Sequence, residues 1–422
     1  MDGLSISPNQ NWILVIPFTV PNDLVKIKVY RHDTLHSFAD LISIIEFGTW
    51  RDNSLIKCQY FGKCSGCQYQ MISYEKQLEL KQIVVEKAFK HFSGLDPSLL
   101  PKIEPTLPSP LQYAYRTKLT PHFELPRNIK APQRNGIGIG NGNGKNELRI
   151  GFAEKGRKRV LDIEDCMIAT SVINEKLTQE RNRVRSTIHT FKRGATLLLR
   201  DSLELATTEP DRHICVTNHK EIVREKVLSV HFEQNAGSFF QNNSSILNPF
   251  LSYIKSLLDD HKPSRKKEEG QEGEGEERYL VDAYCGSGLF SIGLADQFTK
   301  SMGIEVSSES IYWAKHNAKL NKIENVEFMV GKAEAIFADL NFPAQMTTVI
   351  IDPPRKGCDE VFLDQLLDFK PKRILYVSCN VHTQARDVGR LGKVYKVQSI
   401  RGADFFPQSH HCESIVSLSL IE

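Results

Sequence analysis

The chain has 422 residues, which is more than one ordinary hydrophobic core accommodates, so two or three domains are expected. Hydrophobic residues make up 40% of the chain and charged residues 25%, which is typical of a soluble globular protein, and no apolar run approaches the roughly 18 residues that a membrane span needs. The net charge of +3 is small, so contacts with nucleic acid would have to come from local basic patches.

The cysteine content and the N-terminus bear on the cellular compartment. There are nine cysteines, an odd number with uneven spacing, which does not indicate a disulfide framework and favours a reducing compartment. The first residues show neither an export signal nor a transit peptide. We therefore expect a cytoplasmic location, with the nucleus as the alternative, and a monomeric protein with no membrane association.

Residues 1–47 alternate apolar and polar side chains in short runs that prolines separate. Val25, Ile27 and Val29 share one face of a strand, and a second apolar run covers 38–45. This pattern predicts a small OB-like β-barrel. Such barrels commonly carry single-stranded nucleic acid but bind other ligands equally well, so the pattern leaves the ligand open.

Three cysteines follow within ten residues, at Cys58, Cys64 and Cys67, with glycines between them that let the backbone wrap around one centre. A fourth ligand would be required, and Cys166 is the candidate. Four thiolates suit either tetrahedral zinc or an iron–sulfur cluster. The alternative is that these are unpaired structural cysteines.

Residues 48–235, which include this cysteine cluster, predict a central α+β domain. Residues 73–92 have apolar side chains at helical spacing after Ser73, a suitable N-cap, and residues 169–187 predict a charged helix. Between them, residues 113–118 interleave aromatic rings with cations. That pairing stacks bases and holds phosphates in nucleic-acid-binding proteins, but ordinary strands with one solvated face look the same.

Residues 236–422 alternate strands and helices, which predicts a doubly wound α/β domain. Within it, residues 261–278 are almost free of apolar side chains and predict a disordered surface insertion. A strand ending at Asp282 then runs into a turn, Ala-Tyr-Cys-Gly-Ser-Gly, whose glycines let a ligand approach the backbone closely. The next strand ends at Glu305, about 20 residues further on, where such folds place a carboxylate on a ribose diol. The turn resembles the cofactor loop of S-adenosylmethionine-dependent methyltransferases.

Two further apolar strands end in reactive side chains. The first ends at Asp352, which is followed by two prolines that stiffen the turn and then by Arg355. The second, residues 374–377, leads into the turn that contains Cys379. Because ligands bind outside the carboxyl ends of parallel strands, this thiol is either a small core residue or a nucleophile.

The motif Asp-Pro-Pro-Arg-x-Gly at 352–357 and the motif Ser-Cys-Asn-x-x-Thr at 378–383 resemble those of the RNA 5-methyluridine (uracil-C5) methyltransferase family, and the resemblance covers nearly the whole chain. Residues 237–241 and 404–416 match further motifs of that family. The resemblance implies a class I methyltransferase domain that binds S-adenosylmethionine, an N-terminal RNA-binding TRAM domain, and RNA as the partner. By the same resemblance, the nucleophile is Cys379, the base is Glu413, the cofactor contacts are Gln241, Tyr284, Glu305 and Asp352, and the substrate contacts are Phe239 and Arg355.

The implied reaction is methylation of uridine C5 through a covalent bond between Cys379 and C6 of the base. We favour uridine 54 in the T loop of tRNA as the substrate. A ribosomal RNA uridine is the alternative, because Cys58, Cys64, Cys67 and Cys166 match the [4Fe–4S] ligands of the family's ribosomal branch. A hypothesis of a different class is a non-catalytic RNA-binding iron–sulfur protein on a methyltransferase scaffold. Such a protein would be expected to have lost part of the catalytic set.

Overall fold

The computed structural model describes six stretches of the chain, namely residues 3–7, 11–125, 148–205, 212–259, 277–331 and 340–421. The insertion predicted at 261–278 lies almost entirely outside these residues. Within them, no helix combines the length and the apolar character that crossing a membrane requires.

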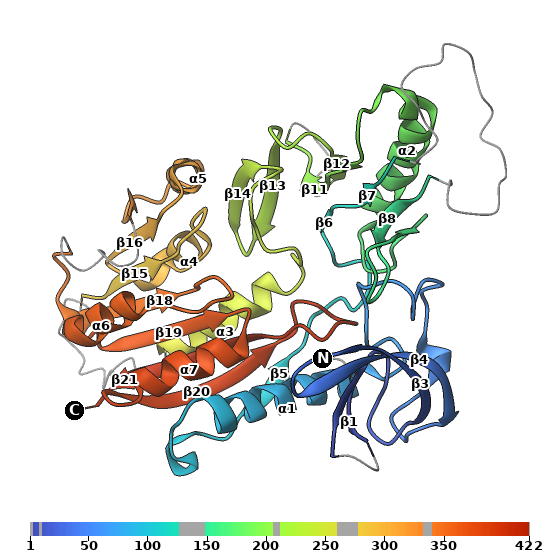
Figure 1. The fold of residues 1–422 in the computed structure, drawn as a ribbon. Helices are drawn as coiled ribbons and strands as arrows, with labels where there is room; N and C mark the ends of the chain where they lie inside the picture. Colours follow the sequence, from blue (N-terminus) through green and yellow to red (C-terminus); the bar gives the residue numbers. More distant parts are fainter. Residues whose placement is uncertain are drawn as a thin grey trace.

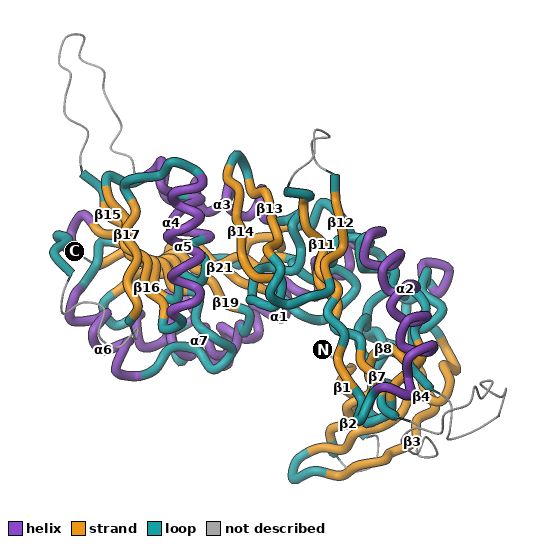
Figure 2. Tube along the Cα trace, turned by 90° about the horizontal axis from the view of Figure 1, so that it is seen from above, coloured by secondary structure: helices purple, strands orange, loops and turns teal. Residues whose placement is uncertain are grey.

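An eight-stranded sheet lies at one end of the molecule (Figures 1 and 2). The first five strands of its order run parallel to their neighbours, and the sixth inserts antiparallel between the fifth and the seventh. The parallel part is the doubly wound arrangement that the sequence predicts, so the predicted fold class is confirmed. The order is β17 (Val326–Val330), β16 (Lys300–Glu305), β15 (Tyr279–Ala283), β18 (Thr347–Ile351), β19 (Arg373–Ser378), β21 (Glu413–Leu420), β20 (Tyr395–Ala403) and β5 (Glu104–Leu107).

Helices cover both faces of this sheet, because neighbouring residues of a strand point to opposite sides. Leu280 belongs to a core that includes residues of α3 (Leu247–Asp259), α4 (Leu289–Gly293) and α5 (Ser308–Leu320). Its neighbour Val281 belongs to a second core, which includes residues of α1 (Tyr74–Phe92), α6 (Glu360–Phe369) and α7 (Val381–Leu391). The central strands are therefore mostly apolar and buried on both faces, with Asp282 as a buried polar residue within β15.

The N-terminal half of the chain contributes to this sheet. The helix predicted over 73–92 is confirmed as α1, and Ser73 caps it by accepting a hydrogen bond from the Lys76 amide. This helix packs against α7 and β20, and β5 extends the sheet by pairing parallel to β20. The segment 48–235 thus supplies one helix and one edge strand to the layers formed mainly by residues 236–422.

The strands predicted in the N-terminal segment are present as a separate four-stranded sheet. Its order is β1 (Gly3–Ile6), β2 (Ile13–Ile16), β4 (His36–Glu46) and β3 (Leu24–His32). The pairings described join only neighbours in this order, and none joins β1 to β3 to close a barrel among the described residues. Figures 1 and 2 place this sheet at the opposite end of the molecule from β16 and β17.

The remaining segment lies between these two sheets in sequence and consists of short strands around one helix, α2 (Ser171–Thr187), where the charged helix was predicted. A hairpin of β13 (Ile222–Val227) and β14 (Val230–Asn235) leads from it toward the large sheet (Figure 1). The other strands are β6 (Lys118–Leu119), β7 (His122–Phe123), β8 (Ile150–Ala153), β9 (Val160–Asp162), β10 (Ala195–Thr196), β11 (Leu199–Leu203) and β12 (His213–Val216).

Candidate active site

The antiparallel strand β21 brings Glu413 beside Cys379. Ser378, the last residue of β19, pairs with Ser414 of β21. Continuing this register by one residue places Cys379 opposite Glu413, although 34 positions separate them in the chain. The parallel neighbour β18 ends directly before Asp352. Three of the residues singled out in the sequence therefore meet at one edge of the sheet.

The turn around Cys379 also fixes the Arg355 loop. The Ser378 hydroxyl accepts a hydrogen bond from the Asn380 amide at 3.1 Å, and the Asn380 carboxamide caps α7 through the His382 amide. The same carboxamide donates to the Arg355 carbonyl at 2.9 Å, and the Thr383 hydroxyl donates to that carbonyl at 3.2 Å. The motif at 378–383 therefore holds the motif at 352–357 in place through hydrogen bonds to the Arg355 carbonyl.

Gln384 joins the strand before the thiol to the strand after the acid. Its side-chain nitrogen donates to the Tyr376 carbonyl at 2.8 Å and to the Ser414 carbonyl at 3.2 Å, and its oxygen accepts from the Ser414 hydroxyl. The side chain is fully buried. Sequence reasoning missed this residue. The signal that could have identified it is a polar side chain on the apolar face of α7, four positions after the helix cap.

The Cys379 thiol is half-buried and lies among charged groups. Burial, followed by the negative charges of Glu413 and Asp352, raises its pKa to about 11, while the charge and a hydrogen bond of the Arg355 side chain act in the opposite direction. At neutral pH the free protein therefore holds this sulfur as the thiol, and a nucleophilic role requires that a bound partner favours the thiolate.

Glu413 is 5% exposed, and its pKa is raised to about 8 by burial and by the charge of Asp352, against the opposing charge of Arg355. Burial and the charge of Asp282 raise the pKa of Asp352 to about 7. A carboxyl group that titrates near neutral pH accepts a proton far more readily than an ordinary glutamate does. The environment of Glu413 is thus suited to a general base.

The turn after β15 has the features that a bound nucleotide-like cofactor needs. Asp282 lies beneath the turn, fully buried, and accepts hydrogen bonds from the amide and hydroxyl of Ser291 at 2.9 and 2.5 Å. Glu305, at the end of β16, reaches the turn by accepting from the Gly286 amide at 3.4 Å. Tyr284 adopts a left-handed backbone conformation (φ 66°) at the start of the turn. These residues fit S-adenosylmethionine, whose ribose diol would bind to a half-buried carboxylate.

Phe239 and Gln241 lie on the segment that connects the β13–β14 hairpin to α3. Phe239 is 76% exposed, whereas the next residue, Phe240, is buried in the core of the large sheet. The Lys118 ammonium group donates to the carbonyl groups of Gly237 and Ser238 at 3.1 and 3.3 Å. The buried ring of Phe240 therefore anchors this segment, and the ring of Phe239 is exposed to a ligand. Lys118, from the aromatic–basic stretch at 113–118, holds the start of the segment.

The four cysteines of the predicted ligand set line one cavity of about 280 Å³. Burial raises the pKa of Cys67, and it raises the pKa of Cys166 to about 11. The negative charge that neighbouring cysteines would carry raises both pKa values further. Among the described residues, however, no group of three or more histidine, cysteine or acidic side chains is arranged to hold a metal ion. The four thiols thus share a cavity, but three or more of them are not brought together there as metal ligands.

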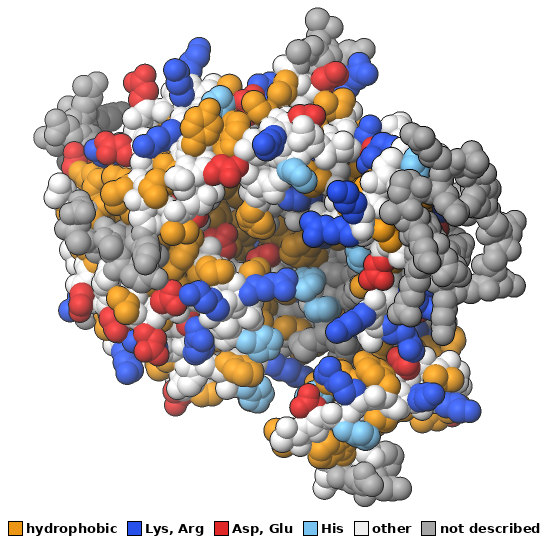
Figure 3. Space-filling model, turned by 45° about the horizontal axis from the view of Figure 1, so that its top comes forward, with side chains coloured by type: hydrophobic (Ala, Val, Ile, Leu, Met, Phe, Trp, Pro, Cys, Tyr) orange, Lys and Arg blue, Asp and Glu red, His pale blue; other side chains and the backbone are white. Residues whose placement is uncertain are grey.

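His411 lies between this cavity and the candidate catalytic residues. Its ring lines the cavity, and its pKa is lowered to about 4, first by burial and then by the charge of Arg355. Figure 3 shows one face of the molecule with a hollow near its middle, where lysine, arginine and histidine side chains gather at the rim. An anionic ligand would meet positive charge on entering such a hollow.

Comparisons with known proteins agree with this geometry. The family described as tRNA (uracil-5-)-methyltransferase matches residues 202–421. A Schizosaccharomyces pombe protein named tRNA (uracil(54)-C(5))-methyltransferase is 49% identical, over all of this chain and 76% of the relative. The Saccharomyces cerevisiae protein of the same name is 39% identical, over all of this chain and 72% of the relative. The crystal structure of Pyrococcus abyssi tRNA (uracil-54, C5)-methyltransferase with S-adenosyl-L-homocysteine superposes with a TM-score of 0.68 at 20% identity, covering 99% of this chain and 97% of that one, which shows a common fold.

Proposed function

Because the chain belongs to the tRNA (uracil-5-)-methyltransferase family, we propose that it methylates C5 of uridine 54 in tRNA. The observation that carries this proposal is the placement of Cys379, Glu413 and Arg355 at the edge of the sheet where the cofactor turn lies. S-adenosylmethionine would be held by Glu305, Tyr284, Asp352 and Gln241 and would supply the electrophilic methyl group.

Cys379 makes C5 reactive in this proposal. Its thiolate sulfur bonds to C6 of uracil, and the electrons of the C5–C6 double bond move toward the C4 oxygen, so C5 becomes nucleophilic. The Arg355 guanidinium and the Gln241 carboxamide are the donors available for that oxygen. Phe239 stacks on the base, which must leave the folded loop of the RNA before C5 and C6 can be reached.

Glu413 completes the reaction. After methylation, C5 carries both the methyl group and a proton. The Glu413 carboxylate removes this proton, the electron pair of the C–H bond re-forms the C5–C6 double bond, and the C6–S bond breaks to release Cys379 as the thiolate. The positive charge of Arg355 stabilises negative charge on both residues and so opposes the rise in pKa that burial causes in each.

The N-terminal sheet is proposed to bind the tRNA outside the target loop. A groove of about 590 Å³ runs between this sheet and the cysteine loop. Its walls combine the exposed ring of Phe47 with the cations of Lys63, Lys155 and Arg157, the last of which is paired with Asp40. Aromatic rings beside cations suit the bases and phosphates of an RNA strand.

Methylation of defined transcripts tests the substrate. The purified protein is expected to methylate a tRNA transcript at position 54, as mapped by mass spectrometry of nuclease fragments, and to leave a transcript with cytidine 54 unmodified. A ribosomal RNA transcript is expected to be inert. Methylation of ribosomal RNA with no reaction on tRNA would replace the proposed substrate by the alternative, and a protein that binds both RNAs but methylates neither would make it a binding protein.

We further propose that Cys58, Cys64, Cys67 and Cys166 hold a [4Fe–4S] cluster. Their shared cavity supports this, because such a cluster takes one thiolate for each of four irons and needs more room than a single ion. Anaerobically purified protein is expected to contain on the order of four irons and four sulfides per chain. A Cys64→Ser variant should lose them, and a Cys285→Ser variant should keep them. Protein purified under these conditions without iron would contradict the proposal.

A further inference from the structure

Glu413 is preceded by a segment without regular secondary structure, residues 404–412, which we call the base loop. It begins where β20 ends, and the Asp404 amide donates to the Leu107 carbonyl of β5 at 2.9 Å. Gln408 within it has a left-handed backbone conformation (φ 68°), which is unfavourable for a residue other than glycine. Contacts from elsewhere in the fold must therefore determine the course of this loop.

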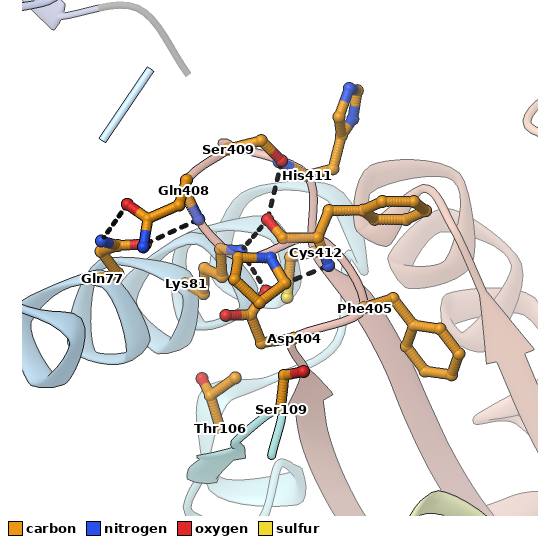
Figure 4. A network of polar contacts seen from close by, with 12 residues as sticks. Gln77, Lys81, Thr106, Ser109, Asp404, Phe405, Gln408, Ser409, His411 and Cys412 are labelled. Carbon is orange, nitrogen blue, oxygen red and sulfur yellow. Dashed lines mark hydrogen bonds and ion pairs between the residues drawn. The ribbon is translucent and has the colours of Figure 1, made fainter. Parts of the chain in front are cut away.

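A buried ion pair holds the start of the base loop. The Lys81 ammonium group lies 2.5 Å from an Asp404 carboxylate oxygen, and the two side chains are 1% and 0% exposed. Lys81 also donates to the Phe406 carbonyl at 3.1 Å, and the Phe406 amide donates to the same Asp404 oxygen at 3.2 Å. Figure 4 shows Lys81 extending from α1 toward Asp404 beneath the loop.

One turn earlier on α1, Gln77 holds the middle of the base loop. Its oxygen accepts from the Gln408 amide at 2.9 Å, and its nitrogen donates to the Gln408 side-chain oxygen at 3.0 Å (Figure 4). The Gln408 carbonyl in turn accepts from the amides of Gln68 and Tyr69, at 2.8 and 3.0 Å, which directly follow Cys67. The cysteine loop and α1 thus meet at one residue.

Two more segments of the candidate site attach to the same loop. The Tyr115 hydroxyl, from the aromatic–basic stretch, donates to the Pro407 carbonyl at 3.0 Å. The Asn243 carboxamide, two residues after Gln241, donates to the Phe405 carbonyl at 3.1 Å. In contrast, the contacts that fix the Cys379 turn come from the Asn380 side chain and from the Arg355 loop, while Gln384 joins β19 to β21.

We propose that Lys81 and Gln77 are positioning residues for the base, and that they hold the base loop so that Glu413 meets the proton on C5. This inference rests on the proposed function. A buried ion pair is a poor way to gain stability, since a well-packed apolar pair of similar volume often does as well. The Lys81–Asp404 pair instead fixes the geometry of the loop, because the ammonium group holds the Asp404 carboxylate and the Phe406 carbonyl at the same time. Proton removal should therefore depend on Lys81 more strongly than attack by Cys379 does.

The test separates these two steps with RNA that contains 5-fluorouridine at the target position. Fluorine at C5 cannot be removed as a proton, so this RNA stops at the covalent adduct and reports attack and methylation without the base. For a Lys81→Met variant, adduct formation should stay within about threefold of wild type. Turnover of ordinary tRNA should fall roughly tenfold to a hundredfold, as expected for a slightly misplaced catalytic group, with methylated enzyme–RNA adduct accumulating on denaturing gels.

Two further variants make the result decisive. Gln77→Met removes the hydrogen bonds to Gln408 without leaving a buried charge. It should show the same pattern as Lys81→Met, and it tests the proposal even if Lys81→Met does not fold. Arg181→Met removes another buried cation, which is 3% exposed and paired with Asp162 in the central segment, and should accumulate no adduct. Equal slowing of both steps, or of neither, would overturn the positioning role. Wild-type protein that forms no adduct with 5-fluorouridine RNA would instead refute the proposed function.

Discussion

Replacing Cys379 with alanine should abolish methylation of tRNA while leaving the binding of tRNA and of S-adenosylmethionine within about threefold of wild type. The sulfur is the only proposed source of electrons for C5, so no slower route through the same site is expected, and loss of a nucleophile typically lowers turnover by roughly 10⁴–10⁶-fold. The measurement is transfer of labelled methyl groups to tRNA, together with formation of an adduct with 5-fluorouridine RNA that withstands denaturation.

A Cys358→Ala variant is the matched control for this experiment. Its thiol is also buried close to the site, where it donates a weak hydrogen bond to the Tyr376 hydroxyl, and the mechanism does not use it. It should retain methylation and adduct formation. Methylation by the Cys379→Ala variant would rule out the covalent mechanism, and an inactive wild-type protein with tight RNA binding would favour the non-catalytic alternative.

Substitution of Glu413 by glutamine should stall the enzyme after methylation. The side chain keeps its size but cannot accept a proton, so the covalent methylated intermediate should accumulate while overall turnover falls by roughly 10²–10⁴-fold. Denaturing gels should show a protein–tRNA species with ordinary uridine that the wild type does not accumulate. Glu360→Gln, which changes an exposed acid on α6, should behave as the wild type does.

The pH dependence of the same step provides a second readout. Glu413 must be ionised to act as a base, and its pKa is about 8, so roughly a tenth of the molecules are competent at pH 7. The rate at which the adduct breaks down should therefore rise with pH and level off above about pH 8. In the Glu413→Gln variant the residual rate should not follow this curve. A wild-type rate that is flat between pH 6 and 9 would remove Glu413 from the role of base.

The expected behaviour of Glu413 depends on contacts between residues that are far apart in the chain. The pKa of Glu413 reflects Asp352 and Arg355, which precede it by about 60 residues, and its position depends on α1 through the base loop. A substitution in α1, distant in sequence from every motif of the family, is for this reason expected to affect one chemical step and not the others.

Local patterns along the chain are sufficient to predict the architecture of the methyltransferase domain and the order of its reactive groups. Strands that are apolar for most of their length are expected to be buried on both faces, and the carboxyl ends of parallel strands meet at one edge, so Asp352 and Cys379 can be assigned to that edge from the sequence. The close spacing of Cys58, Cys64 and Cys67 likewise indicates a common centre, and the three thiols do line one cavity.

The distant segments that complete this site follow from the tertiary fold alone. Pairing of β19 with the antiparallel β21 places Glu413 opposite Cys379, β5 joins the sheet from the other half of the chain, and Lys81 meets Asp404 across 323 positions. Local periodicity encodes which face of an element is buried but not which partner covers it. That choice depends on the packing of the whole chain, where a buried lysine is stable only when the fold supplies its carboxylate.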